Sequence, residues 1–318
     1  MKKVTVRMVG KAAGVSHSTV SRVLNSDPRV HPVTRDRVLA AAREMGYLIE
    51  CGNGRRTVAL ILGSNRIAGY ISSALAAMLS ELRECGYRAE LVNAADIELL
   101  GSRAVTGAIA IALDDRLNER WSELPNLPLV RLNAASSHRD NIYSVNSDGL
   151  SGMKLAVDFL IGHGHRRIVF LSEERFDREL VLPSGRYRGF CTAMRAAGVV
   201  EPEAFCYFSD RPRPVGRAWR DTGITAGICV GELHGAVAAR QLYEEGIRIP
   251  EEFSLLSLEH PSVSENLIPP HTTLSQDFPE LARRAVALLD NLIGHRAATD
   301  IMVPYRLVVR RSVRRLGQ

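Results

Sequence analysis

The side chains best suited to a chemical role lie between Val15 and Asn25, in the run Val-Ser-His-Ser-Thr-Val-Ser-Arg-Val-Leu-Asn. His17, Ser18 and Arg22 fall on one face of a helix, where a guanidinium or imidazole can hydrogen bond to base-pair edges. Hydroxyl groups of the same run can contact phosphates: Ser16, Thr19 and Ser21. The run predicts the second, base-reading helix of a helix-turn-helix.

A helix-turn-helix needs a tight turn before this run and a buried face on it. Gly14 supplies the turn, because glycine adopts a positive φ at little cost, and Ser16 is a good N-cap for the next helix. Val20, Val23 and Leu24 repeat at helical spacing on the other face. Taken alone, this pattern also fits an ordinary short amphipathic helix.

Two neighbouring segments favour the helix-turn-helix. A second apolar stripe ends at the glycine turn: Val6, Val9 and Ala13. Downstream, a third helix begins after His31, with Pro32 at its first position. Its apolar stripe comprises Val38, Ala41, Ala42 and Met45. We therefore expect a small all-helical domain over residues 1–47.

The net charge of +6 is concentrated at the start of the chain. Residues 1–56 contain eleven Lys or Arg and four Asp or Glu, which gives +7 and leaves the remainder at −1. A basic segment can be merely a solvated surface. Because this basic segment coincides with a helix-turn-helix pattern, it indicates a nucleic-acid partner for the N-terminal domain alone.

After residue 56 the chain alternates apolar strands with amphipathic helices, which is typical of parallel sheets with crossover helices. We expect strands at 58–62, 89–92, 108–112, 129–132, 168–171, 226–230, 253–258 and 306–309. We expect helices at 71–83, from Asp148 through Leu160, and at 186–197, 235–244 and 279–293. The pattern starts again near residue 168 and predicts two α/β units in tandem, with a ligand site where their strand ends face each other.

Composition limits the remaining classes of function. No run of 18 apolar residues and no apolar leader is present, so we expect a cytoplasmic protein with no membrane partner. The five cysteines form no CxxC pair, which favours free thiols. His163 and His165 have no Cys or Glu at metal-ligand spacing. We expect neither a metal site nor a cofactor.

Motifs of common α/β enzymes are absent from the sequence. It contains no GxGxxG, GxxxxGK[ST], GxSxG or HExxH. We expect no enzyme activity. The alternative is a small-molecule-binding α/β protein or enzyme without regulated DNA binding, which would leave the basic N-terminal domain unexplained.

The chain resembles the LacI family of bacterial transcription regulators over nearly its whole length. The resemblance rests on Ala13–Ser16, Thr19–Asn25 and Thr34-Arg35 near the start, and on recurrent segments such as Gly164–Ile168 and Pro269–Gln276. It implies a repressor-type, sequence-specific regulator that binds a near-palindromic operator in double-stranded DNA as a homodimer. A small effector, usually a sugar in this family, would modulate the affinity.

The resemblance also implies a fold and its boundaries. The fold is an N-terminal all-α helix-turn-helix headpiece (1–47), a linker (48–56) and a periplasmic-binding-protein-like α/β core of two Rossmann-like subdomains (57–318). Subdomain one would comprise about 57–161 and 278–305, and subdomain two about 162–277 and 306–318. Three crossovers would join them.

Family roles carry over to matching positions only. The DNA-binding positions are Thr5, Ser16, His17, Ser18, Thr19, Ser21, Arg22, Asn25, His31 and Thr34, with Arg22 bound to guanine O6 and N7. The effector positions are Tyr70, Asp148, Arg186, Glu259, Gln276 and Phe278. Asp148 could instead cap a helix, Phe278 could belong to the core, and Arg186 could pair with a carboxylate.

The linker departs from the family pattern. Only nine residues separate Tyr47 from Thr57, and Gly52-Asn53-Gly54 is poor helix-forming sequence. Relatives have a longer linker whose hinge helix places a leucine in the minor groove and kinks the operator. We therefore expect no hinge helix here, and either little operator bending or tolerance of variable half-site spacing.

Overall fold

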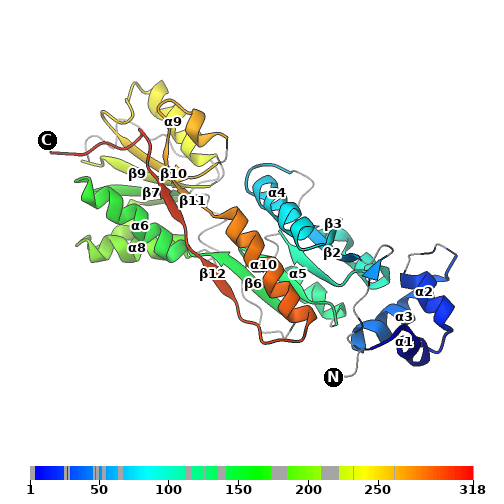
Figure 1. Ribbon diagram of the computed structural model, residues 1–318. Coiled ribbons are helices and arrows are strands. Elements are labelled where there is room, and N and C mark those ends of the chain that lie inside the picture. Colours follow the sequence, from blue (N-terminus) through cyan, green and yellow to red (C-terminus); the bar gives the residue numbers. More distant parts are fainter. Residues whose placement is uncertain are drawn as a thin grey trace. The chain divides into compact units, whose positions relative to one another are not determined.

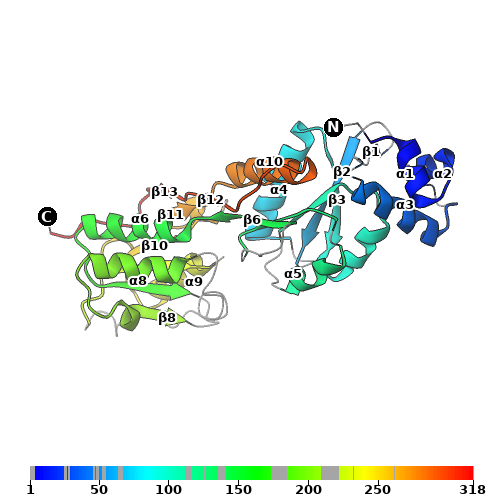
Figure 2. The same cartoon turned by 90° about the horizontal axis from the view of Figure 1, so that it is seen from below.

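The computed structural model describes residues 4–24, 27, 29–45, 47, 50–51, 55–63, 67–111, 116–124, 126–134, 141–172, 185–208, 222–231, 233–260 and 262–317. Within them the chain forms two compact units (Figures 1 and 2). Unit 1 comprises Met1–Asn146 and Phe278–Ile301, and unit 2 comprises Ser147–Asp277 and Met302–Gln318. The chain therefore passes from one unit to the other three times.

Unit 1 begins with three helices, α1 (Val6–Ala13), α2 (His17–Leu24) and α3 (Pro32–Glu44), which form the expected all-helical headpiece. The other helical elements of the unit are α4 (Gly69–Glu84), the 3₁₀ helix η1 (Ala94–Ser102), α5 (Arg116–Arg120), the 3₁₀ helix η2 (Trp121–Glu123) and α10 (Phe278–Ile293). Its strands are β1 (Glu50–Cys51), β2 (Arg55–Leu62), β3 (Arg88–Asn93), β4 (Gly107–Ala110), β5 (Leu129–Leu132) and β6 (Ile142–Ser147).

The sheet of unit 1 has the strand order β1-β2-β4-β5-β6, with β3 also paired to β2 and β12 (Ile301–Val303) beyond β6. The pairs β2–β3, β2–β4, β4–β5 and β5–β6 are parallel. Figure 2 shows α4 and α10 on one face of the sheet and α5 on the other. Both faces are buried along β4, β5 and β6, as a parallel sheet requires, whereas the edge strand β3 is largely exposed. Trp121 lies in the cluster beneath α5.

Unit 2 has a second sheet, ordered β13-β11-β10-β9-β7-β8. Its strands are β7 (Ile168–Ser172), β8 (Cys206–Phe208), β9 (Ala226–Val230), β10 (Ser254–Leu258), β11 (Thr272–Ser275) and β13 (Arg306–Val308). Its helices are α6 (Gly149–Gly162), α8 (Arg186–Ala196) and α9 (His234–Glu244), with 3₁₀ turns η3 (Pro202–Phe205) and η5 (Ser264–Asn266). All described pairings are parallel except β11–β13.

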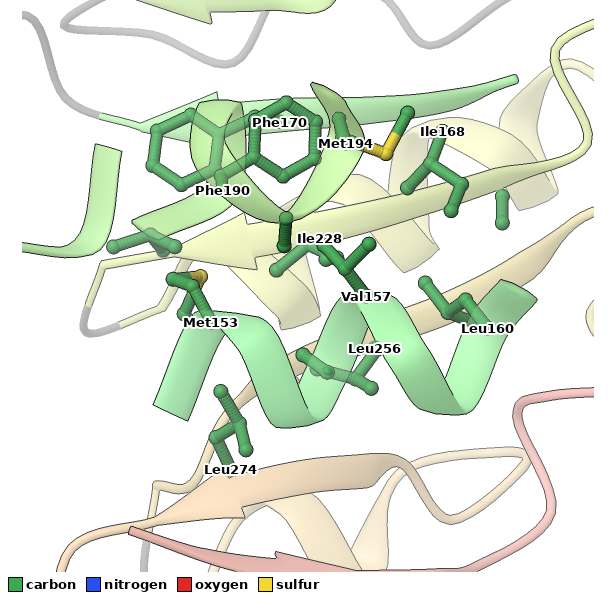
Figure 3. Close-up of a cluster of buried hydrophobic side chains, with 14 of the residues drawn as sticks. Met153, Val157, Leu160, Ile168, Phe170, Phe190, Met194, Ile228, Leu256 and Leu274 are labelled. Carbon is green, nitrogen blue, oxygen red and sulfur yellow. The ribbon is translucent and has the colours of Figure 1, made fainter. Parts of the chain in front are cut away.

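Alternating side chains of the second sheet bury on opposite faces. Ile168 and Phe170 of β7 pack with Ile228 and Leu256 beneath α6 and α8, whose Val157 and Phe190 complete the cluster (Figure 3). Their neighbours in the strands pack instead beneath α9: Val169, Leu171, Cys229 and Leu255. The period of two along each strand therefore produces two apolar layers around one sheet.

The unit boundaries differ from those expected at 161/162 and 305/306. The chain passes into unit 2 at 146/147 and again at 301/302, so α6 belongs to unit 2. The physical reason is packing, because Met153, Val157 and Leu160 of α6 share one buried cluster with β7, β9 and α8. Gly152 permits the close approach of Tyr305, whose ring carbon would lie 2.7 Å from an added Cβ.

The structure also bears on three narrower expectations, which concern the cysteines, membrane-spanning helices and His165. Cys85, Cys191, Cys206 and Cys229 are free thiols. Within the described part of the chain, no helix combines the length and apolar character needed to cross a membrane. His165 is buried and has a structural role, since Nδ1 lies 2.8 Å from Thr225 Oγ1 and Nε2 lies 3.1 Å from Arg314 O.

Candidate nucleic-acid interface

The headpiece helices enclose one apolar cluster, which fixes how α2 is presented. Val20, Val23 and Leu24 of α2 are at most 6% exposed. They pack against Val9 and Ala13 of α1 and against α3, which contributes Val38, Leu39, Ala41 and Ala42. Because one face of α2 is buried, the opposite face must point to solvent.

The turn before α2 forms as the sequence indicates. Gly14 adopts the left-handed conformation (φ 65°, ψ 37°), and Val15 N donates to Gly10 O at 2.9 Å. Ser16 Oγ accepts from Thr19 N at 3.1 Å, which is the hydrogen bond of an N-cap. The Ser16 hydroxyl also lies 2.8 Å from Ser18 Oγ and 2.9 Å from Thr19 Oγ1. Three hydroxyls therefore gather at the N-terminus of α2.

The predicted DNA-binding residues lie on the surface of this headpiece. Six are exposed: Thr5, Ser16, His17, Ser18, Arg22 and His31. Three are partly buried: Thr19, Ser21 and Thr34. Asn25 lies outside the described residues. The structure therefore brings His17, Ser18 and Arg22 to the exposed face of one helix, where all three side chains can reach a partner.

An ion pair between Asp27 and Arg29 lies after α2, and sequence reasoning missed it. Arg29 Nε and Nη2 donate to the two carboxylate oxygens of Asp27 at 3.0 and 2.8 Å, and Arg35 Nη2 donates to Asp27 O at 2.7 Å. The hydrogen bonds from Arg29 lower the pKa of Asp27 to about 2, and the charge of Arg22 acts in the same direction. Asp27 therefore stays ionised and partly balances the positive charge near Arg22.

The expected effector residues of unit 1 lie together. The rings of Tyr70 and Phe278 are 5.8 Å apart at 51°, and both side chains are partly buried. Asn133 Nδ2 donates to Tyr70 Oη at 3.1 Å from a backbone position with φ 48°. Sequence reasoning missed Asn133, because a positive φ at a non-glycine residue, which often marks a functional site, cannot be read from the sequence.

The expected effector residues of unit 2 have partners of their own. Asp148 caps α6, because its carboxylate accepts from Ser151 N at 3.1 Å and Ser151 Oγ at 2.6 Å. Gln276 Oε1 accepts from Ser147 Oγ at 2.9 Å, which brings Gln276 next to the start of α6. Arg186 is the first residue of α8 and is partly buried.

Glu259 is held by an arginine that sequence reasoning did not single out as a site residue. Arg310 Nη1 and Nη2 donate to its two carboxylate oxygens at 3.0 and 3.1 Å, and Thr273 Oγ1 also donates to it. Arg310 Nη1 donates in addition to His271 O at 2.8 Å. Glu259 therefore sits in a largely buried polar cluster at the ends of β10 and β11. Across the described residues, no group of three or more His, Cys, Asp or Glu is arranged to hold a metal ion.

Comparisons with known proteins match both parts of the chain. Residues 5–49 match the family model for bacterial regulatory proteins of the lacI family, and residues 157–313 match the periplasmic binding protein-like domain. The transcriptional repressor PurR of Pasteurella multocida is 28% identical over 98% of both chains. The transcriptional repressor CytR of Escherichia coli K12 is 26% identical over 98% of this chain and 97% of its own.

Solved structures agree over the full length. The complex of the transcriptional regulator CelR with cellobiose aligns with a TM-score of 0.69 at 27% identity, covering 97% of this chain and 99% of that one. The lac repressor dimer bound to operator and the anti-inducer ONPF has the same fold, with a TM-score of 0.68 at 24% identity and 98% and 100% coverage. The chain therefore combines a LacI-family helix-turn-helix domain with a periplasmic-binding-protein-like core, and over nearly its full length it is similar to transcription regulators of that family.

Proposed function

We propose that this protein is a sequence-specific transcriptional repressor that binds a near-palindromic operator as a homodimer. The observation that carries the proposal is the exposed face of α2, where His17, Ser18 and Arg22 stand opposite a fully packed face. The relative PurR, a transcriptional repressor, supports repression, and the lac repressor, solved as a dimer on its operator, supports dimeric binding.

Within this proposal, each exposed residue of the headpiece has a role set by its chemistry. Arg22 reads guanine, because its planar fork matches the O6 and N7 acceptors. Hydroxyl and imidazole groups around it contact phosphates and fix the register: Thr5, Ser16, Thr19, Ser21, His31 and Thr34. We assign Asn25 as a further phosphate contact on the sequence pattern alone.

We infer that a small effector modulates operator affinity, and that a sugar is the ligand to test first. The solved CelR structure is a complex with cellobiose, a sugar, and the paired rings of Tyr70 and Phe278 offer an apolar surface of the kind that sugar rings pack against. We assign Tyr70 and Phe278 of unit 1 as contacts, and Asp148, Arg186, Glu259 and Gln276 of unit 2. An effector can shift operator affinity only by as much as it prefers one state of the protein.

Binding-site selection with purified protein tests the DNA half of the proposal. The wild type should enrich a symmetric site. Arg22→Ala should lose about 1–3 kcal/mol of discrimination at one base position of each half-site, because a bidentate contact disappears. Lys11→Ala is the matched control, since this exposed charge should weaken binding evenly across sequences.

Two results would overturn the assignment. One is an Arg22→Ala variant with unchanged base preference. The other is a wild-type protein that ignores every duplex at low salt, where phosphate contacts are strongest. A screen of sugars and nucleosides for release of the selected operator then tests the effector half.

A further inference from the structure

We propose that Arg43 is a positioning residue that fixes the headpiece to the sheet domain of unit 1 and thereby sets the half-site spacing of the operator. The proposal rests on the proposed DNA-binding function. It adds how the base-reading helix is held in place.

The first observation is a set of hydrogen bonds that crosses from α3 to η1. Arg43 Nη2 donates to Leu100 O and Arg103 O, both at 3.0 Å, and Nη1 donates to Gly101 O at 3.5 Å. These partners are 57 to 60 residues away in sequence. A guanidinium carries five donors in a rigid fork, so one side chain can bind several backbone carbonyls at once.

The second observation is apolar and lies beside the first. Ala104, which follows η1, is 7% exposed and belongs to the same buried cluster as Val38, Leu39 and Ala42 of the headpiece. The headpiece core therefore extends to a residue of the sheet domain. The guanidinium hydrogen bonds and this buried side chain together form what we call the α3–η1 contact.

The third observation is the short connection. β1 pairs antiparallel with the start of β2, with Glu50 opposite Arg56 and Cys51 opposite Arg55, so Glu50 and Cys51 are tied to the sheet. Tyr47 still belongs to the headpiece, where its N donates to Ala42 O at 2.8 Å and its side chain packs on the cluster. Two residues separate Tyr47 from Glu50, and the link can span at most about 11 Å.

The α3–η1 contact leaves the DNA-reading side of the headpiece open. Arg43 is on α3, whereas His17, Ser18 and Arg22 are exposed on α2. A groove of about 580 Å³ borders the contact, and its acidic lining residues are Asp36, Glu98 and Glu123. Arg43 also lines this groove and Glu98 is paired with Arg120, which leaves Asp36 and Glu123 to disfavour phosphates here. We therefore expect DNA to approach from the α2 side while the headpiece stays docked.

A docked headpiece cannot follow changes in half-site spacing. Each base pair inserted between half-sites moves the second one by roughly 3.4 Å and rotates it by roughly 34–36°. A tightly held headpiece must break the α3–η1 contact to compensate, whereas a free headpiece turns on its linker. The geometry therefore favours a narrow spacing preference rather than tolerance of variable spacing.

Operator variants with zero, one, two and three base pairs inserted or removed between half-sites test this proposal by titration. The wild type should bind one spacing about tenfold better than its neighbours, because a charged hydrogen-bond set must otherwise break. Arg43→Ala should flatten this profile and leave the base preference within each half-site unchanged. Arg43→Lys should restore part of it, since the ammonium can still donate to carbonyls.

Arg37→Ala is the matched control, because Arg37 is an exposed arginine on the same helix. It should leave the ratio between spacings unchanged even if it weakens binding. A misfolded headpiece would lower the affinity for every spacing and every half-site together. A headpiece released from η1 would instead flatten the spacing profile and keep its base preference, so the two cases can be distinguished.

A second measurement needs no DNA. Protease cleavage between Tyr47 and Arg55 should be faster in Arg43→Ala than in the wild type and in Arg37→Ala, because loss of the α3–η1 contact lets the headpiece move away from the sheet more often. A flat spacing profile in the wild type, or Arg43→Ala with an unchanged profile and unchanged cleavage, would overturn the proposal. Failure to bind any duplex would refute the proposed function instead, and the cleavage comparison would still decide the role of Arg43.

Discussion

Lowering the pH from 7.5 to 5.0 should destabilise unit 2 through His271. This side chain is 0% exposed, and its Nδ1 lies 3.4 Å from Ser257 Oγ. The pKa of His271 is lowered to about 4, mainly by burial and further by the positive charge of Arg310. The carboxylate of Glu259 acts in the opposite direction and raises the pKa. Folding therefore keeps the imidazole neutral where the unfolded chain would protonate it.

The sign and size follow from proton binding. The ordinary histidine pKa is 6.5, and the folded value is about 4. Above pH 6.5 both states are neutral, and the contribution to stability is complete. As the pH falls below 6.5 only the unfolded state takes up a proton, so stability declines until about pH 4. Between pH 7.5 and 5.0 the loss is about 2 kcal/mol, because each pH unit in the window costs roughly 1.4 kcal/mol.

Urea unfolding followed by circular dichroism at the two pH values measures this loss. Hydrogen exchange of the β10 and β11 amides assigns it to unit 2. The control is His271→Asn, which keeps a hydrogen-bonding side chain but cannot titrate. It should remove about 2 kcal/mol of pH dependence, leaving the smaller part from His165, whose pKa burial also lowers. Equal pH dependence in the two proteins would refute the reasoning.

Two further substitutions probe the polar contacts of the fold. Arg310→Ala should destabilise unit 2 by about 2–3 kcal/mol in urea unfolding, because it leaves the largely buried Glu259 carboxylate without its two-bond partner; Arg310→Lys should lose less. Ser16→Ala should lower headpiece stability by about 1 kcal/mol through loss of the α2 N-cap, seen as faster exchange of the Thr19 amide. Unchanged exchange at Thr19 would show that the cap contributes nothing.

The parts of the fold that are encoded locally could be predicted from the sequence. The turn at Gly14, the cap at Ser16 and the buried face of α2 each depend on residues within one or two helical turns. Strands such as β5 and β9 are short, mostly apolar runs and stand where expected. Exposure of Arg22 followed from the same periodicity, because a residue opposite a buried stripe points to solvent.

Elements with polar side chains escaped prediction. β6 runs Ile-Tyr-Ser-Val-Asn-Ser and buries Ser144, Asn146 and Ser147, so its sequence resembles a loop. β11 buries Thr272 and Thr273, and these polar side chains likewise hid the strand from prediction. The place of α6 was also misjudged, because periodicity says that one face of a helix is buried but not against which sheet. Asn133 and Arg43 act on residues more than fifty positions away, and no local pattern reports such contacts.

The order of the units along the chain has a consequence for synthesis on the ribosome. Except for Ala104, the apolar core of the headpiece comes from residues up to Tyr47, so its three helices can pack together before the sheets are made. The sheet domain of unit 1 lacks α10 until residue 293 is made, and unit 2 lacks β13 until residue 308, when Leu307 pairs with Leu274. A nascent polypeptide therefore contains the helix-turn-helix headpiece before either α/β sheet is complete. Under the proposed function, the nascent headpiece would contact DNA before the proposed effector site exists.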